Sequence, residues 1–223
     1  MPLKAVLFDL DGTLLDTAPD FQTALNLLLA EENKQPLSQE EVKVMVSHGS
    51  ADLIANAFHM EATHPDFEPL RARLLTFYLQ HLSENTRYFQ GLDASLSYIE
   101  QQGLAYGIVT NKPSLYADKI ITDLNIEVDC LICPDHVAKP KPDPEALLLA
   151  CQQLGCEPEE AIFVGDHDRD VIAGKAANMP TVAAAWGYIP LGESVEDWKA
   201  DYLVQAPEDL LPLLVELNER PND

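Results

Sequence analysis

Residues 4–16 read KAVLFDLDGTLLD, an apolar run that leads into three aspartates. The residues up to Phe8 are typical of a buried strand, and Gly12 supplies a turn after it. Asp9 and Asp11 are two positions apart, so on a strand their side chains would lie on the same side. Two carboxylates that close repel each other. Such an arrangement requires a cation, a shared proton or water to offset the repulsion.

The composition indicates a soluble globular protein. Its 223 residues, 47% of them hydrophobic, are enough for one large domain or for one domain with a smaller insertion. The net charge of −23 disfavours a nucleic-acid partner, because such binding depends on Lys and Arg at phosphates. Asp9 and Asp11 interrupt the first apolar run, and no run reaches the roughly 18 apolar residues of a membrane span. We therefore expect a cytoplasmic protein without a membrane partner.

Short apolar strands alternate with helices along most of the chain. The predicted strands cover residues 4–8, 104–110, 128–133, 161–165, 181–186 and 202–204. The predicted helices among them include 92–102, 144–154 and 170–178. This alternation predicts an α/β fold with a doubly wound parallel sheet, in which sites form beyond the carboxyl ends of the strands. We assign residues 1–16 and 86–223 to this Rossmann-like core domain.

Residues 17–85 break the alternation, because they carry helical periodicity and no convincing strand. Apolar residues recur at helical spacing over 21–29 and 70–78, and Ser38 with Glu41 forms a capping-box pattern. This segment is predicted to be an inserted α-helical domain. Since it leaves the sheet just after the first motif, we expect it to act as a lid over the acidic residues.

Four cysteines occur, and two of them have a C-x-x-C spacing: Cys130, Cys133, Cys151 and Cys156. On a strand this odd spacing directs the two thiols to opposite faces. The sequence has no second C-x-x-C or neighbouring His pair that would complete a zinc site. We therefore predict that the cysteines are core residues.

Four groups of polar residues fall at or just after predicted strand ends. They are Asp9 with Asp11; Thr110, Asn111 and Lys112; Lys139 with Lys141; and Asp166, Asp168 and Asp170. Carboxylates from two strands can bind a hard cation such as Mg²⁺ through oxygen ligands. Hydroxyl, amide and ammonium groups are suitable donors to phosphate oxygens. A bound cation would offset the repulsion within the first motif.

Four motifs resemble those of the haloacid dehalogenase superfamily of phosphatases, in its phosphoglycolate phosphatase-like branch. They are DLDGTLLD at 9–16, IVTN at 108–111, KPDP at 141–144 and GDHDRD at 165–170. They occur in the family's order, each with the expected strand. The resemblance implies an Mg²⁺-dependent phosphatase for a small phosphate ester, with the inserted helices as its cap.

By this resemblance, Asp9 is the nucleophile that becomes a phosphoaspartate, and Asp11 is first the general acid and then the base. Thr110, Asn111 and Lys141 are expected to bind the substrate's phosphoryl group. Lys141 is preferred to Lys139, because its distance from the following helix matches the family pattern.

The same resemblance assigns the metal ligands to Asp9, the backbone carbonyl of Asp11 and Asp166, with Asp170 as a direct or water-linked ligand. We expect Asp168 to be solvated or to touch the water shell of the ion. His167 and Arg169 are expected to be surface residues, and the turn beside the site leaves open that either reaches the substrate.

The turn at 47–50 is the candidate specificity loop, because the family's cap contacts the non-phosphate end of the substrate. His48, Gly49 and Ser50 are the proposed substrate-binding residues there, and Ser50 is expected to cap the next helix. Phosphoglycolate is one candidate substrate. The stretches KPKPDP, GDHDRD and VAAAWGY are also similar to those of bacterial N-acetylmuramic acid 6-phosphate phosphatases.

The sequence leaves other interpretations to experiment. A sugar phosphomutase of the same fold would use the same aspartates but protect its phosphoaspartate from water. A signalling receiver also combines an α/β sheet with an acidic cluster, but receivers are shorter and lack a helical lid. The protein is compatible with either a monomer or a dimer.

Overall fold

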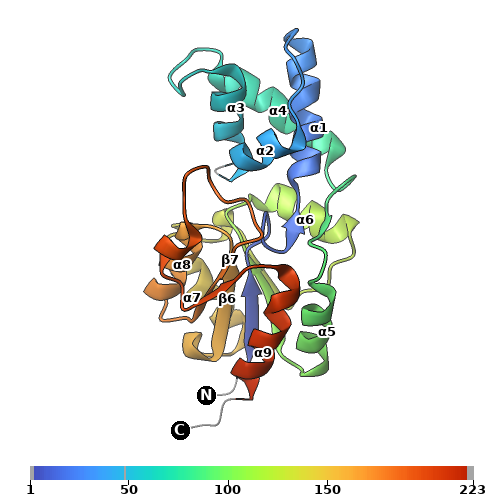
Figure 1. Ribbon diagram of the computed structural model, residues 1–223. Helices are drawn as coiled ribbons and strands as arrows, with labels where there is room; N and C mark the ends of the chain where they lie inside the picture. The colour runs from blue at the N-terminus through green and yellow to red at the C-terminus, as the bar shows by residue number, and fades with distance from the viewer. Residues whose placement is uncertain (1–2, 48, 220–223) are drawn as a thin grey trace. The chain divides into compact units, whose positions relative to one another are not determined.

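The computed structural model describes residues 3–47 and 49–219. The chain divides into two compact units, each described here by itself (Figure 1). Among the described residues, the core unit contains 3–15, 88–189 and 193–219, and the helical unit contains 16–87 and 190–192.

The core unit contains a six-stranded parallel sheet in the order β5-β4-β1-β6-β7-β8 (Figure 1). Its strands are β1 (Ala5–Phe8), β4 (Ala105–Val109), β5 (Cys130–Ile132), β6 (Ala161–Gly165), β7 (Thr181–Ala184) and β8 (Tyr202–Val204). The predicted α/β fold with a parallel sheet is confirmed. Several strands are one to three residues shorter than the apolar runs that predicted them.

Helices cover both faces of the sheet (Figure 1). They are α5 (Asp93–Gln101), α6 (Ser114–Asp123), α7 (Glu145–Leu154), α8 (Asp168–Ala176) and α9 (Leu210–Asn218), with short 3₁₀ helices at Pro134–His136, Pro158–Glu160, Val195–Trp198 and Pro207–Asp209. On the face covered by α7 and α8, Leu7 and Phe163 of the sheet join Leu147 and Ala173 in one buried cluster. Helices α5 and α9 lie on the opposite face. Burial on both faces explains why the strands are continuously apolar.

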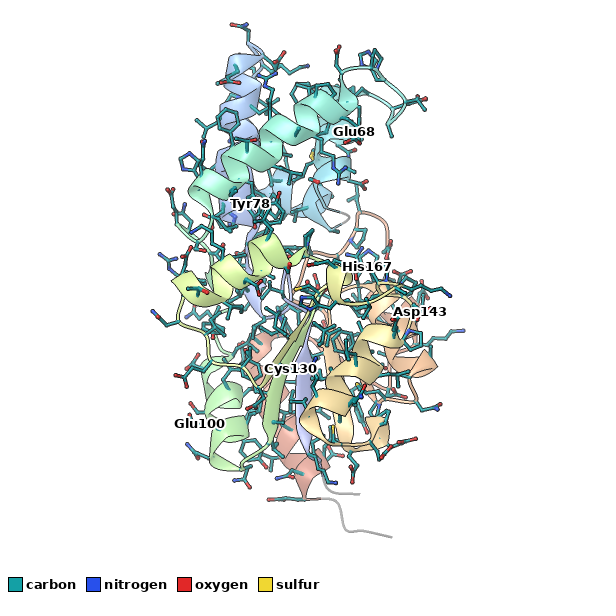
Figure 2. All side chains as sticks on the ribbon, turned by 180° about the vertical axis from the view of Figure 1, so that it is seen from behind. Glu68, Tyr78, Glu100, Cys130, Asp143 and His167 are labelled. Atoms are coloured by element: carbon teal, nitrogen blue, oxygen red, sulfur yellow. The ribbon has the colours of Figure 1, made fainter. Side chains whose placement is uncertain are left out.

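The cysteines lie in this core unit and are free thiols. Cys130, Cys133 and Cys151 are buried, and Cys156 is half-buried; Cys130 is labelled in Figure 2. Burial raises the pKa of Cys130 to about 11 and those of Cys133 and Cys151 to about 12. Thiols with such pKa values are poor nucleophiles. The prediction that the cysteines are core residues is confirmed for the three buried ones.

The helical unit consists of α1 (Ala18–Glu31), α2 (Gln39–Val46), α3 (Ser50–Phe58) and α4 (Phe67–His81). Helices α1 and α4 pack together, and the rings of Phe21 and Tyr78 stack with centroids 3.8 Å apart. The predicted capping box at the start of α2 is confirmed, because Ser38 Oγ accepts the Glu41 amide and the Glu41 carboxylate accepts the Ser38 amide.

Two very short strands, β2 (Leu15–Asp16) and β3 (Arg87–Tyr88), pair where the chain passes from one unit to the other. Just beyond them, the buried Asp20 accepts the amides of Asn85 and Thr86 at 2.7 and 3.1 Å. The first turn of α1 is therefore bonded to the segment that returns to the sheet. Among the described residues, no helix combines the length and apolar character needed to cross a membrane.

Candidate active site

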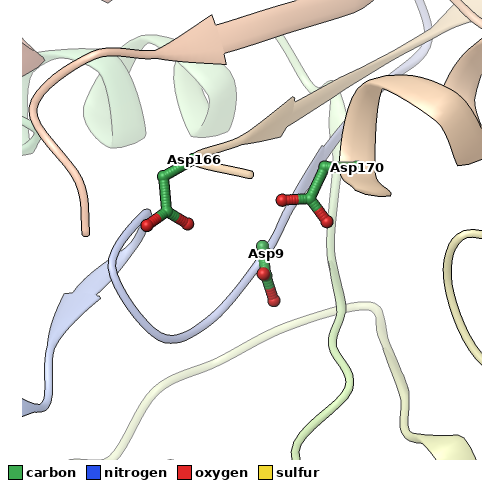
Figure 3. Close-up of side chains that lie close together, drawn as sticks. All are labelled: Asp9, Asp166 and Asp170. Carbon is green, nitrogen blue, oxygen red and sulfur yellow. The ribbon is translucent and has the colours of Figure 1, made fainter. Parts of the chain in front are cut away.

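Three aspartates from two segments of the core unit form an acidic cluster. Asp9 follows β1, Asp166 follows β6, and Asp170 lies in the first turn of α8. The three are at most 5% exposed, and one oxygen from each lies within 4.8 Å of the others. Figure 3 shows that the three side chains lie close together. The structure thus brings together the side chains that the sequence proposed as metal ligands.

Burial dominates the electrostatics of this cluster. It raises the pKa of Asp9, although Lys141 opposes the rise. Burial, together with the charges of Asp9 and Asp170, raises the pKa of Asp166 to about 7. Both shifts mean that the carboxylate forms are disfavoured by their surroundings.

Lys141 supplies a positive charge to two of the three aspartates. Its side chain is 0% exposed, and Nζ lies 3.1 Å from Asp9 Oδ1 and 2.7 Å from Asp170 Oδ1. Three buried carboxylates against this one ammonium leave an excess of negative charge, and all the donors are hard oxygens. This donor set fits Mg²⁺, which prefers carboxylate ligands.

Asp166 is held between two segments that lie far apart in the sequence. Thr13 Oγ1 donates to Asp166 Oδ1 at 2.7 Å, and the Tyr188 amide donates to Oδ2 at 2.7 Å. A Cβ added to Gly12 or Gly187 would lie 2.1 or 2.5 Å from the same Oδ2, so both glycines are needed for this close approach. The sequence pattern did not predict the contribution of Gly187 and Tyr188. The Gly-Tyr pair directly after the apolar run at 181–186 was the available signal.

The residues after β4 fix the position of Lys141. Lys141 Nζ donates to the Val109 carbonyl at 2.8 Å. The Asn111 side chain donates to the Lys141 carbonyl at 2.8 Å and accepts the Lys141 amide at 3.1 Å. Thr110 is 3% exposed, and its Oγ1 accepts the Lys112 amide at 3.1 Å. The Asn111 amide, predicted to bind substrate, is therefore engaged with the lysine backbone.

The two lysines of the third motif have different environments. Lys141 reaches Asp9 and Asp170, whereas the Lys139 side chain is 75% exposed and lies 3.8 Å from the Asp143 carboxylate. Of the two, Lys141 is the one whose ammonium joins the acidic cluster.

Asp11 lies in the turn that follows β1, not on the strand itself. The turn is closed by the Gly12 amide, which donates to the Leu15 carbonyl at 2.9 Å. The Asp11 side chain is 25% exposed, and Lys112 Nζ donates to its Oδ1 at 2.8 Å. Asp9 and Asp11 are thus each paired with a lysine.

Two residues of the fourth motif are less exposed than the sequence predicted, namely His167, which is buried, and Arg169, which is half-buried. Asp168 has a side chain that is 45% exposed, as expected, but His167 is 6% exposed and not a surface residue. His167 is the N-cap of α8: its Nδ1 accepts the Arg169 amide at 3.3 Å, and its own amide donates to Asp170 Oδ2 at 3.1 Å. These capping contacts hold the imidazole away from solvent, with its ring nearly parallel to that of Trp198 and the ring centroids 6.4 Å apart.

The candidate specificity turn belongs to the helical unit, and His48 lies outside the described residues. The Gly49 amide donates to the Val46 carbonyl at 2.8 Å, which closes the turn. Gly49, with φ of 84°, is the N-cap of α3. The expectation that Ser50 caps α3 is therefore wrong; Ser50 is the first helical residue, and its Oγ accepts Arg71 Nε at 3.0 Å.

Comparison with known proteins gives a consistent result. Residues 6–184 match the sequence profile of the family described as haloacid dehalogenase-like hydrolase. A protein named N-acetylmuramic acid 6-phosphate phosphatase from Pseudomonas aeruginosa is 42% identical over 216 residues, 96% of each chain. A protein named phosphoglycolate phosphatase from Xanthomonas campestris pv. campestris is 40% identical over 210 residues, 93% of this chain and 94% of that one.

Among solved structures, a predicted phosphoglycolate phosphatase from Haemophilus somnus superposes with a TM-score of 0.82 at 24% identity, covering 95% of this chain and 97% of that one. At this identity the match supports the fold alone. Together these matches confirm the resemblance drawn from the four motifs.

Proposed function

Because the chain belongs to the haloacid dehalogenase-like hydrolases and, like its curated relatives, is a phosphoric monoester hydrolase, we propose that it works with Mg²⁺ through an aspartyl-phosphate intermediate. One observation carries this proposal: the buried Asp9 lies against the Lys141 ammonium within a cluster of three carboxylates. A carboxylate nucleophile needs the incoming phosphate's charge to be neutralised, and this arrangement is suited to that requirement.

In the first step, an Asp9 carboxylate oxygen bonds to phosphorus while the bond from phosphorus to the ester oxygen breaks. Asp11 transfers its proton to that leaving oxygen. In the second step, Asp11 accepts a proton from a water molecule whose oxygen attacks phosphorus. The bond between Asp9 and phosphorus then breaks and releases inorganic phosphate. Thr110 and Lys141 bind the phosphoryl oxygens during both steps.

The carboxylates of Asp9, Asp166 and Asp170 would bind Mg²⁺, with the backbone carbonyl of Asp11. When bound, the ion supplies positive charge to the phosphoryl oxygens and to the surrounding carboxylates. Lys141 by itself balances only part of the negative charge in this cluster.

Removal of the metal tests the proposal directly. Phosphate release from a generic aryl phosphate should stop in excess chelator and return when Mg²⁺ is added in excess. The reason is that the bare carboxylates repel the phosphate dianion. Undiminished turnover in chelator would exclude the metal-dependent mechanism.

For the substrate, we propose a phosphate monoester that carries a carboxylate. Phosphoglycolate is one candidate. N-acetylmuramic acid 6-phosphate is the second, and it is favoured by the 42% identity over 96% of each chain to a phosphatase of that name. A panel with both esters, scored for free phosphate and for isomerised sugar phosphate, distinguishes these substrates from each other and a phosphatase from a phosphomutase.

A further inference from the structure

Lys112 forms an ion pair with the second aspartate of the first motif. Its Nζ donates to Asp11 Oδ1 at 2.8 Å, across 101 residues of sequence. The Lys112 side chain is only 4% exposed, and that of Asp11 is 25% exposed. This pair differs from an exposed surface ion pair, because an ammonium is costly to bury and remains charged there only when it is well paired.

The backbone around Lys112 is fixed by its neighbours. The Lys112 amide donates to Thr110 Oγ1 at 3.1 Å, just beyond the end of β4. Pro113 follows and precedes α6, whose first amide, that of Ser114, donates to Asp135 at 2.9 Å. The ammonium is therefore presented to Asp11 from an anchored segment of the core unit.

The two buried lysines of the site contact different aspartates. Lys141 contacts Asp9 and Asp170, whereas Lys112 contacts Asp11. Asp9 and Asp11 have different proposed tasks, so the two lysines serve different tasks as well.

We propose that Lys112 is a positioning residue that orients the Asp11 carboxyl group for proton transfer, an inference that rests on the proposed function. Because Nζ donates to Oδ1 at 2.8 Å, the transferred proton is carried by the other carboxyl oxygen, Oδ2, and Oδ1 accepts the hydrogen bond whether Asp11 is protonated or not. This bond restricts rotation of the whole carboxyl group. Proton transfer requires the donor and acceptor atoms to lie within about 2.6 to 3.2 Å of each other. Without the Lys112 contact, the Asp11 carboxyl group would be held less firmly and would meet this condition for less of the time, so leaving groups that need a proton would depart more slowly.

The test compares two kinds of ester in the unsubstituted protein and in Lys112→Met with Mg²⁺ present. One ester has an alkoxide leaving group that needs a proton, and the other is an aryl phosphate that does not. We expect kcat/KM for the alkyl ester to fall by about tenfold, which is part of the roughly 10²- to 10⁴-fold that general acid catalysis contributes. The aryl ester should lose little. Lys119→Met, which removes the exposed partner of Asp123 on α6, is the matched control and should change neither value.

A double-mutant cycle adds a readout that a structural role would not change. In an Asp11→Asn background, Lys112→Met should have no further effect on the alkyl ester, because both substitutions remove the same proton transfer. Thermal unfolding checks that each variant folds. If the Met variant does not fold, Lys112→Gln removes the charge and retains a hydrogen-bond donor, and the same comparison applies.

Equal losses on both esters with a raised KM would overturn the inference, because Lys112 would then contact the phosphoryl group itself. Unchanged kinetics, or additive losses with Asp11→Asn, would overturn it as well. Failure of the proposed function is seen separately: the unsubstituted protein would then release no phosphate from either ester with Mg²⁺.

Discussion

The proposed covalent step depends on the Asp9 side chain, which can be replaced by asparagine without a change of shape. Asp9→Asn preserves the shape of the side chain and removes both the nucleophile and a proposed metal ligand. It also removes a buried charge that burial and Asp170 already disfavour. We expect turnover to be abolished, while circular dichroism and thermal unfolding remain those of a folded protein.

Asp168→Asn is the matched control for this substitution, because its carboxylate is 45% exposed and lies in the neighbouring motif. It should retain the activity of the unsubstituted protein. Substantial residual hydrolysis by Asp9→Asn would count against an aspartyl-phosphate intermediate.

Gly187 is required beside Asp166, because a side chain at this position would collide with the aspartate. An added Cβ would lie 2.2 Å from Asp166 Cβ and 2.5 Å from its Oδ2. Gly187→Ala should therefore displace Asp166 and raise the Mg²⁺ concentration for half-maximal activity by about tenfold or more, as for other disturbed metal ligands. Titration of activity with Mg²⁺ measures the effect.

Gly103→Ala separates metal binding from general destabilisation. Gly103 has φ of +65° and no neighbouring heavy atom within 4 Å of an added Cβ. Its replacement should cost about 1 kcal/mol of backbone strain and leave the Mg²⁺ requirement unchanged. If both variants shift the Mg²⁺ requirement alike, contact with Asp166 is not the cause.

At the scale of secondary-structure elements, the turn between α2 and α3 depends on one backbone conformation. Gly49 has φ of 84° and ψ of −164°, a region in which residues other than glycine are strained. Gly49→Ala should reshape the turn that we propose to bind the carboxylate end of the substrate. We expect kcat/KM for the two carboxylate-bearing esters to fall by about tenfold, which corresponds to about 1.4 kcal/mol for one lost hydrogen bond, with little change for an aryl phosphate.

His48→Ala tests the side chain of the same turn and should give the same pattern, with the Mg²⁺ requirement unchanged in both variants. Equal losses on every ester, or no loss on any, would indicate that the turn only connects two helices.

At the scale of the whole molecule, the acidic cluster couples folding to pH. Burial raises the pKa of Asp166 from its ordinary value of 3.8 to about 7, and that of Asp9 in the same direction. The folded state then binds more protons than the unfolded state between these values, so the free energy of unfolding falls as the pH rises from about 4 to about 7. Thermal unfolding in chelator should show this decrease.

Mg²⁺ should reverse the decrease, because it binds the deprotonated carboxylates of the folded state. A ligand at about 100 times its Kd stabilises the folded state by about 2.7 kcal/mol. The rise in Tm on adding Mg²⁺ should therefore be larger at pH 8 than at pH 5. Asp166→Asn should reduce both the pH dependence and the Mg²⁺ effect. A Tm that does not respond to Mg²⁺ at pH 8 would contradict the metal assignment.

The sequence by itself determined the order of strands and helices along the chain. It also determined which polar residues follow the strands. These are local properties, since apolar periodicity and turn residues act over a few positions. It did not reveal β2 and β3, because a two-residue strand has no periodicity. It also placed His167 at the surface, because a capping imidazole and an exposed one have the same local pattern.

Only the tertiary structure decided which side chains meet. It placed Lys141, which the sequence had already favoured over Lys139, beside Asp9, and it paired Lys112 with Asp11 across 101 residues. Such contacts depend on which parallel strands are neighbours and on how each following loop turns. The few residues around a motif determine neither which strands are neighbours nor how the loops turn. These contacts are therefore fixed only when the whole sheet has formed.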